Sequence, residues 1–195
     1  MNYIQKTAAI LGLTGLAAAY AASGEAMFVQ PLPGKPFAKT KLTCQLPGQV
    51  GVFNTMDIAE NYSGLTDLTR PIVGPLNGRV RLLHGNKPIS DLEAGLDVVI
   101  PTGKLPAYAE TYVTHNGKTG TLGFFGTISK RLATLFGKDL TAGTDICAEA
   151  YGRVKPEAYW ANASPWLTLG QFKLGYGLTA TPDGLSHNVG AGLTF

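Results

Sequence analysis

The sequence is poor in charged residues: Asp, Glu, Lys and Arg make up only 15% of its 195 positions. It lacks a run of five or more like charges, so it has no basic stripe for nucleic acid, and nucleic acid is not an expected partner. Its 25 glycines and 12 prolines argue against a helix-rich protein, because both residues are unfavourable inside helices. Its 45% hydrophobic content argues against a disordered chain. The composition favours a single all-β domain with many turns.

Cysteine and histidine are also scarce. Cys44 and Cys147 lack the paired spacing of a zinc or thioredoxin-like site. They form either one disulfide, if the chain is exported, or two reduced thiols packed as small apolar residues. His84, His115 and His187 are far apart and outside any H-E-x-x-H pattern, so no metal or cofactor is expected.

Residues 1–26 have the pattern of a secretory signal peptide. Lys6 supplies the positive start, and residues 7–22 form an uncharged stretch rich in Ala, Leu and Gly. Ala19-Tyr20-Ala21 and Gly24-Glu25-Ala26 each match the small-residue pattern at which signal peptidases cleave. A retained membrane anchor is the competing interpretation, but a spanning helix needs roughly 20 strongly apolar residues and this stretch is shorter.

A proline-rich segment follows the leader. Pro31, Pro33 and Pro36 lie within residues 27–40, which we expect to form an extended linker. The folded domain is then expected to span residues 41–195.

Alternation of apolar and polar residues, the pattern of a half-buried strand, is the main structural signal. Four stretches show it clearly: 91–100, 145–154, 171–180 and 185–195. Four more are weaker candidates: 50–58, 79–84, 108–114 and 122–129. Asn116-Gly117 predicts a hairpin turn between the last two, while residues 129–136 fit a short amphipathic helix. Roughly eight strands of ~9 to 11 residues are expected, a length that crosses a bilayer with tilt.

The last two clear stretches predict a hairpin, because Thr181-Pro182-Asp183-Gly184 has the residues of a tight turn. If the turn closes with Ala180 opposite Leu185, apolar residues face apolar residues along the whole hairpin. The expected pairs are Tyr176 with Val189, Leu174 with Ala191, Phe172 with Leu193 and Gly175 with Gly190.

The composition of the polar side of this hairpin distinguishes a membrane barrel from a soluble sandwich. It consists mostly of Gly, Thr, Asn and Ser, where a water-facing sheet usually carries Lys and Glu. Small residues suit the interior of a narrow barrel, which side chains must fill. Aromatic residues near the strand ends suit the headgroup level of a bilayer as well as a protein core. The alternative is a secreted or membrane-anchored β-sandwich that serves as a binding or assembly module, such as a surface or virion component.

The C-terminal strand resembles that of the bacterial outer-membrane β-barrel family. Its apolar residues Val189, Ala191 and Leu193 stand at every second position before the final aromatic residue Phe195. The resemblance implies a closed antiparallel transmembrane β-barrel in the outer membrane, with the lipid bilayer as its surroundings. It also implies that this segment is the signal read by the barrel-insertion machinery. Residues 164–169 resemble the periplasmic turn that often precedes the penultimate strand, and His187 departs from the family pattern.

Charged residues on the polar faces of the strands are the candidates for lining the lumen. They are Arg79, Arg81, Asp91, Glu93, Asp97, Asp145, Glu149, Arg153 and Lys173. Buried charges must be paired, so these residues predict either a salt-bridged interior or a narrow aqueous path. The expected function is that of a non-enzymatic structural element or narrow pore with a mixed-charge lumen.

A rim-site lipid hydrolase is the enzymatic alternative. Asp183, Ser186 and His187 would lie near one rim of the barrel. However, Ser186 and His187 are adjacent in a strand and point to opposite faces, which is poor geometry for a nucleophile and its base. No catalytic residue is therefore assigned.

Overall fold

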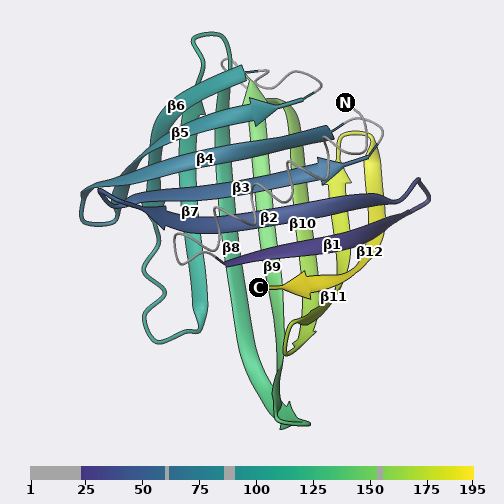
Figure 1. Cartoon of the computed structure of the whole chain (residues 1–195). Helices are drawn as coiled ribbons and strands as arrows, with labels where there is room; N and C mark the ends of the chain where they lie inside the picture. Colours follow the sequence, from purple (N-terminus) through teal and green to yellow (C-terminus); the bar gives the residue numbers. More distant parts are fainter. Residues whose placement is uncertain (1–22, 60–61, 86–90, 153–155) are drawn as a thin grey trace.

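The described residues form a closed antiparallel β-barrel of twelve strands (Figure 1). The computed structural model describes residues 23–59, 62–85, 91–152 and 156–195. The strands are β1 (Ser23–Leu32), β2 (Phe37–Leu46), β3 (Val50–Ile58), β4 (Tyr62–Val73), β5 (Leu76–His84), β6 (Asp91–Val99), β7 (Ala107–His115), β8 (Gly120–Leu135), β9 (Lys138–Gly152), β10 (Pro156–Leu169), β11 (Phe172–Thr181) and β12 (Gly184–Thr194). Each strand pairs with its neighbours in sequence, and β1 pairs with β12 to close the wall. Among the described residues, no helix is long and apolar enough to span a membrane.

The expectation of roughly eight strands is wrong, although a closed all-β barrel is confirmed. The eight predicted stretches correspond to β3, β5 to β9, β11 and β12. The four additional strands are β1, β2, β4 and β10. The first four residues of β2 fall in the expected linker, although Lys39, Lys41 and Thr43 share one face of it. Other additional strands lack a clean alternation. In β4, for example, Leu65 shares a face with Asp67, while Thr66 shares the other face with Leu68. Pairing with both neighbours stabilises such a strand without a clean pattern of its own.

The expected linker over residues 27–40 is also wrong. Met27 pairs with Lys39 between β1 and β2, and Val29 pairs with Gly190 of β12. The prolines are accommodated because Pro31 lies near the end of β1, while Pro33 and Pro36 belong to the connection to β2. The described wall therefore starts at Ser23 and includes the last four residues of the expected leader. Residues 1–22 lie outside the described part of the chain.

Two local predictions are overturned by long-range pairing. Residues 129–136, expected as a helix, continue strand β8 as far as Leu135 because β9 offers a hydrogen-bonding partner. Residues 164–169, expected as a turn, lie within β10, where Pro165 stands opposite Thr144. In both segments, interstrand hydrogen bonds outweigh the local preference.

The two predicted hairpin turns are confirmed. Ala180 pairs with Leu185, and all four expected pairs between β11 and β12 are observed. At the other turn, the Asn116 side chain accepts hydrogen bonds from the backbone N–H groups of Lys118 and Thr119, both at 2.9 Å. These turns set the register locally, as their residue types require.

The wall has an apolar outer face and a polar inner face. Large apolar side chains on the outside are widely exposed, including Phe28, Leu96, Val113, Leu122, Leu174 and Leu193. β1 starts and β12 ends at one end of the barrel, here called the termini end, where the β8–β9 turn also lies (Figure 1). Exposed apolar residues outside and buried charges inside are the reverse of a water-soluble domain.

Candidate functional site in the barrel interior

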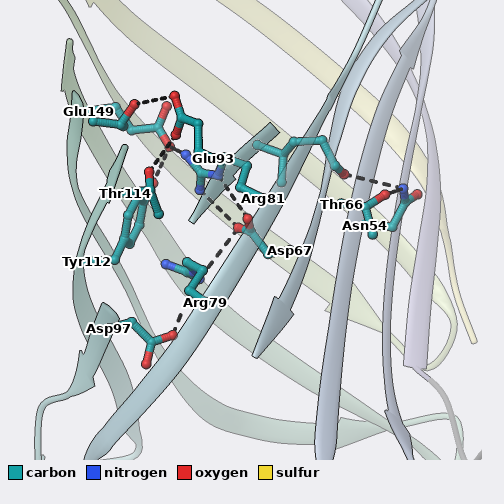
Figure 2. Close-up of polar contacts among 12 residues, drawn as sticks. Asn54, Thr66, Asp67, Arg79, Arg81, Glu93, Asp97, Tyr112, Thr114 and Glu149 are labelled. Atoms are coloured by element: carbon teal, nitrogen blue, oxygen red, sulfur yellow. Dashed lines mark hydrogen bonds and ion pairs between the residues drawn. The ribbon is translucent and has the colours of Figure 1, made fainter. Parts of the chain in front are cut away.

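Polar side chains from β4 to β9 meet inside the barrel and form what we call the ionic cluster (Figure 2). Its members are Asp67, Arg79, Arg81, Glu93, Asp97, Glu110, Tyr112 and Glu149. Each of these residues is at most 9% exposed. Charges buried to this degree must be paired to be tolerated.

Arg81 connects opposite parts of the cluster. Its Nε and Nη2 atoms donate to the two oxygens of Asp67 at 2.8 and 2.9 Å, a two-pronged arrangement that suits a guanidinium group. Its Nη1 donates to Glu149 Oε1 at 2.6 Å. Asp67 lies on β4, which is next to β5. Glu149 lies on β9, four strands away from β5 along the wall. Arg81 therefore bridges the interior from one wall segment to another (Figure 2).

Arg79 lies nearer the termini end of the barrel than Arg81 and pairs with a different set of carboxylates. Its Nη2 donates to Glu110 Oε1 at 2.6 Å, and its Nε lies 3.6 Å from Asp97 Oδ2. The guanidinium carbons of Arg79 and Arg81 lie 4.1 and 4.6 Å from the centre of the Tyr112 ring. This ring therefore contacts both cations through its π system.

The cluster contains five carboxylates and two guanidinium groups. Neutral side chains donate further hydrogen bonds to two of the carboxylates, those of Glu93 and Glu149. Thr114 and Thr121 donate to Glu93 at 2.5 and 3.0 Å. Tyr112 and Tyr151 donate to Glu149, with Trp160 Nε1 donating to the same carboxylate at 3.0 Å. Each of the five carboxylates accepts at least one hydrogen bond, whereas the Nε and Nη1 atoms of Arg79 have no hydrogen-bond partner among the described residues.

Gly123 makes room for Tyr112 within this network. The two residues are paired between β7 and β8, and the Tyr112 ring lies directly over the glycine. A Cβ atom at position 123 would overlap the ring atoms. The absence of a side chain therefore permits the ring to reach both arginines and Glu149.

A second set of contacts, here called the lysine bridge, crosses the rest of the interior. Its members are Glu25, Lys41, Asp145, Trp166 and Lys173. Lys41 Nζ on β2 lies 3.9 Å from Asp145 Oδ2 on β9. Lys173 Nζ lies 2.5 Å from Glu25 Oε2 and 5.0 Å from the centre of the Trp166 ring, and Trp166 Nε1 donates to Asp145 at 3.2 Å.

The lysine bridge joins strands from opposite sides of the barrel. Lys41 lies on β2, and its ammonium group is also 5.3 Å from the centre of the Phe125 ring on β8. β2 and β8 are separated by five strands in either direction around the wall. Side chains therefore span the interior at this level.

The structure distributes the nine predicted lumen residues over several places. Five of them meet in the ionic cluster: Arg79, Arg81, Glu93, Asp97 and Glu149. Asp145 and Lys173 belong to the lysine bridge. Asp91 lies apart at the end opposite the termini, where it accepts a hydrogen bond from Asn116 Nδ2 at 2.6 Å. Arg153 lies outside the described residues.

Several members of the site escaped prediction for identifiable reasons. Asp67 lies in β4, which lacks a clean alternation, and Glu25 lies in the segment expected to be a leader. Glu110 and Tyr112 lie in a predicted strand, where Tyr108, Glu110, Tyr112 and Thr114 share one face. That shared face is the signal that could have identified them.

The suggested disulfide between Cys44 and Cys147 is wrong, since both thiols are free. Cys147 shares the inner face of β9 with Asp145 and Glu149, whereas Cys44 lies on the outer face of β2, out of phase with the inward Lys41. Opposite faces of the wall prevent the approach that a disulfide requires.

The suggested rim site does not form a catalytic pair. Ser186 pairs with Thr179 and His187 with Leu178, which places the two side chains on opposite faces of β12. The His187 Nδ1 atom shares a hydrogen bond with the Tyr176 hydroxyl. His187 therefore cannot act as the base for Ser186, because its side chain lies on the other face of the strand.

Comparison with known proteins supports the fold. No protein-family model and no curated protein matches the sequence. A solved structure described as a KdgM porin matches with a TM-score of 0.52 and 11% sequence identity, covering 89% of this chain and 99% of that chain. At this identity the likeness establishes the fold alone. Together with the closed barrel, it argues against the β-sandwich alternative.

Proposed function

We propose that this chain is a bacterial outer-membrane β-barrel that acts as a narrow pore with a mixed-charge lumen. The observation that carries the proposal is a closed wall with apolar side chains outside and paired charges inside. Hydrocarbon cannot hydrogen-bond a backbone, so a barrel without open edges is one of the two backbone structures that span a bilayer. The fold shared with a protein described as a porin adds support.

The C-terminal strand supports the same location. Val189, Leu193 and Phe195 are 42 to 49% exposed, and Ala191 has the same outward register. In this proposal the expected leader exports the chain, and these four residues are recognised by the barrel-insertion machinery. Lipid then covers them in the inserted barrel.

The permeation path in this proposal lies beside β10, β11 and β12. The ionic cluster fills the interior along β4 to β9 with side chains that are almost fully buried. By contrast, the inward residues Asn162, Ser164, Thr179 and Asn188 are small, uncharged and only half-buried. Such a wall leaves room for water and for small polar solutes. The lysine bridge narrows the path without adding a large unpaired charge.

The pore can be tested by reconstituting the folded protein in liposomes and measuring leakage of small neutral sugars and electrical conductance. Ser164→Trp places a large ring in the proposed path, so it should reduce the sugar flux severalfold. Ala163→Trp is the matched control, because it changes the adjacent residue on the outer face of the same strand. Both variants should retain wild-type folding by heat-dependent gel mobility.

The outcomes separate the parts of the proposal. A folded wild-type protein with no leakage would contradict the pore and leave a structural barrel. Equal flux through both tryptophan variants would contradict the proposed path. Recovery of the protein in the soluble cell fraction would contradict the membrane location itself.

A further inference from the structure

The β8–β9 hairpin continues past the rest of the barrel at the termini end (Figure 1). These two strands have 16 and 15 residues, compared with nine in β5, β6 and β7. Strand β7 supports β8 only as far as the Ala107–Ile128 pair and the bond from Ser129 N–H to the Pro106 carbonyl. Within the described part of the chain, residues 130–135 pair with β9 alone, which leaves one backbone edge open. We call residues 130–142 the hairpin extension.

The two faces of the hairpin extension differ. The face continuous with the barrel interior is polar, and Arg131, Thr134 and Asp139 hydrogen-bond with one another there. The face continuous with the outer wall carries the pairs Lys130–Ala142, Ala133–Leu140 and Leu135–Lys138. At the tip, Phe136 is 95% exposed, and the nearby Leu132 and Leu135 are 55% and 42% exposed. Apolar residues of the outer face therefore continue to the end of the hairpin, with Lys130 and Lys138 placed among them on the same face.

Cations flank this apolar tip. The charged residues of the extension are Lys130, Arg131, Lys138 and Asp139. Asp139 and Arg131 form a salt bridge of 3.0 Å, so the two lysines give the extension a net positive charge. Exposed aromatic and aliphatic groups beside lysines are the composition of segments that bind the surface of anionic membranes.

We infer that the hairpin extension is an interfacial anchor that binds the anionic phospholipid headgroups around the barrel. The inference rests on the proposed membrane location. Phe136 and Leu135 insert at the boundary of the acyl chains, while Lys130 and Lys138 contact lipid phosphates. Residues 130–135 cannot lie in the hydrocarbon core, because the N–H and C=O groups of their open edge need hydrogen-bond partners. The headgroup layer provides water and phosphate oxygens for this edge and apolar contact for the tip.

The physical alternatives fit less well. Pairing with the same edge of a second copy would bring two positively charged hairpins together, and like charges in contact are destabilising. Full exposure to water would leave the Phe136 ring and two leucines solvated. The bulge between Arg131 and Ala133 also distorts the edge, which disfavours pairing with another strand.

The test uses the full-length barrel folded into vesicles, with a fluorescent reporter at the tip. Phe136→Trp is measured in vesicles of phosphatidylcholine alone and of phosphatidylcholine with phosphatidylglycerol, each containing lipids brominated near the headgroup or deep in the acyl chain. After subtraction of the Trp160 and Trp166 background, the added tryptophan should be quenched by the shallow bromines. Quenching should be stronger with phosphatidylglycerol and should fall as salt is added.

Two further variants make the result interpretable. Leu174→Trp reports a lipid-facing position of the barrel wall, since Leu174 is 60% exposed on the outer face. Lys130→Gln with Lys138→Gln, added to Phe136→Trp, should weaken the preference for anionic vesicles roughly fivefold per lysine.

Each result has one meaning. Quenching at position 174 without quenching at position 136 would overturn the anchor and leave the membrane location intact. Absence of quenching at both positions would overturn the membrane location as well. Quenching at position 136 that is insensitive to phosphatidylglycerol and to both lysines would overturn the recognition of phosphate.

Discussion

Gly24 and Phe195 exchange two backbone hydrogen bonds, one from Gly24 N–H to the Phe195 carbonyl at 2.8 Å and one from Phe195 N–H to the Gly24 carbonyl at 3.0 Å. These bonds join the beginning of β1 to the end of the chain and complete the closure of the barrel. The Phe195 ring also lies across Gly24, where a Cβ atom would be 2.6 Å from ring atom Cε2. The residue expected to signal insertion therefore also takes part in closing the wall.

Replacing Gly24 by valine should weaken this closure. The added side chain must displace the Phe195 ring, and overpacking of this kind costs about 1–3 kcal/mol. The loss of unfolding free energy is measured by urea unfolding of the protein in detergent micelles, with heat-dependent gel mobility as the readout of the folded fraction. Ala26→Val is the control, because Ala26 is exposed on the same face of β1, and its effect should stay within about 0.5 kcal/mol. Equal stability of the two variants would contradict the role assigned to the contact.

The position of β1 predicts where the leader is removed. Ser23 pairs with Thr43, and Glu25 bonds Lys173 inside the barrel, so cleavage after Ala26 would remove part of the wall. Cleavage after Ala21 leaves both contacts in place. We therefore expect the exported protein to begin before Ser23, which intact-mass spectrometry of the outer-membrane fraction would reveal. A mature protein that begins at Met27 would contradict the assigned start of the barrel.

Removing the charge of Arg81 should destabilise the barrel strongly. Arg81→Met leaves the Asp67 and Glu149 carboxylates buried without their shared cation, a change that typically costs about 3–5 kcal/mol. Arg131→Met is the matched control, since the Arg131–Asp139 pair is 62% and 55% exposed and such pairs contribute about 0–1 kcal/mol. Both free energies of unfolding follow from urea titration. Adding Glu149→Gln to Arg81→Met should recover part of the loss.

Gly123→Ala should disturb the Tyr112 ring. The new methyl group occupies the place of the ring, so Tyr112 must move and its hydrogen bond to Glu149 is lost or distorted. The expected cost is about 1–3 kcal/mol, again measured by urea unfolding. At Gly120 a Cβ atom would meet its nearest neighbour at 3.5 Å, an ordinary contact, so Gly120→Ala is the control. A neutral Gly123→Ala would show that the ring position is adaptable.

The sequence by itself determined those features that depend on neighbouring residues. The turn at Thr181-Pro182-Asp183-Gly184 and the alternation on both sides of it were enough to predict every pair of the last hairpin. The turn at Asn116-Gly117 and the faces of β6 and β9 are likewise local properties. Because strand partners in a hairpin are adjacent in the chain, their register is encoded in a short segment.

Only the tertiary structure decided the number of strands and the composition of the charged interior. β1 and β4 are strands because partners on both sides bond their backbones, and β1 finds one of its partners at the far end of the chain. The contacts of Arg81 with Glu149 and of Lys41 with Asp145 depend on the curvature of the closed wall, which brings distant strands face to face. Alternation can assign a charge to the inner face, but barrel closure determines which opposite charge it meets.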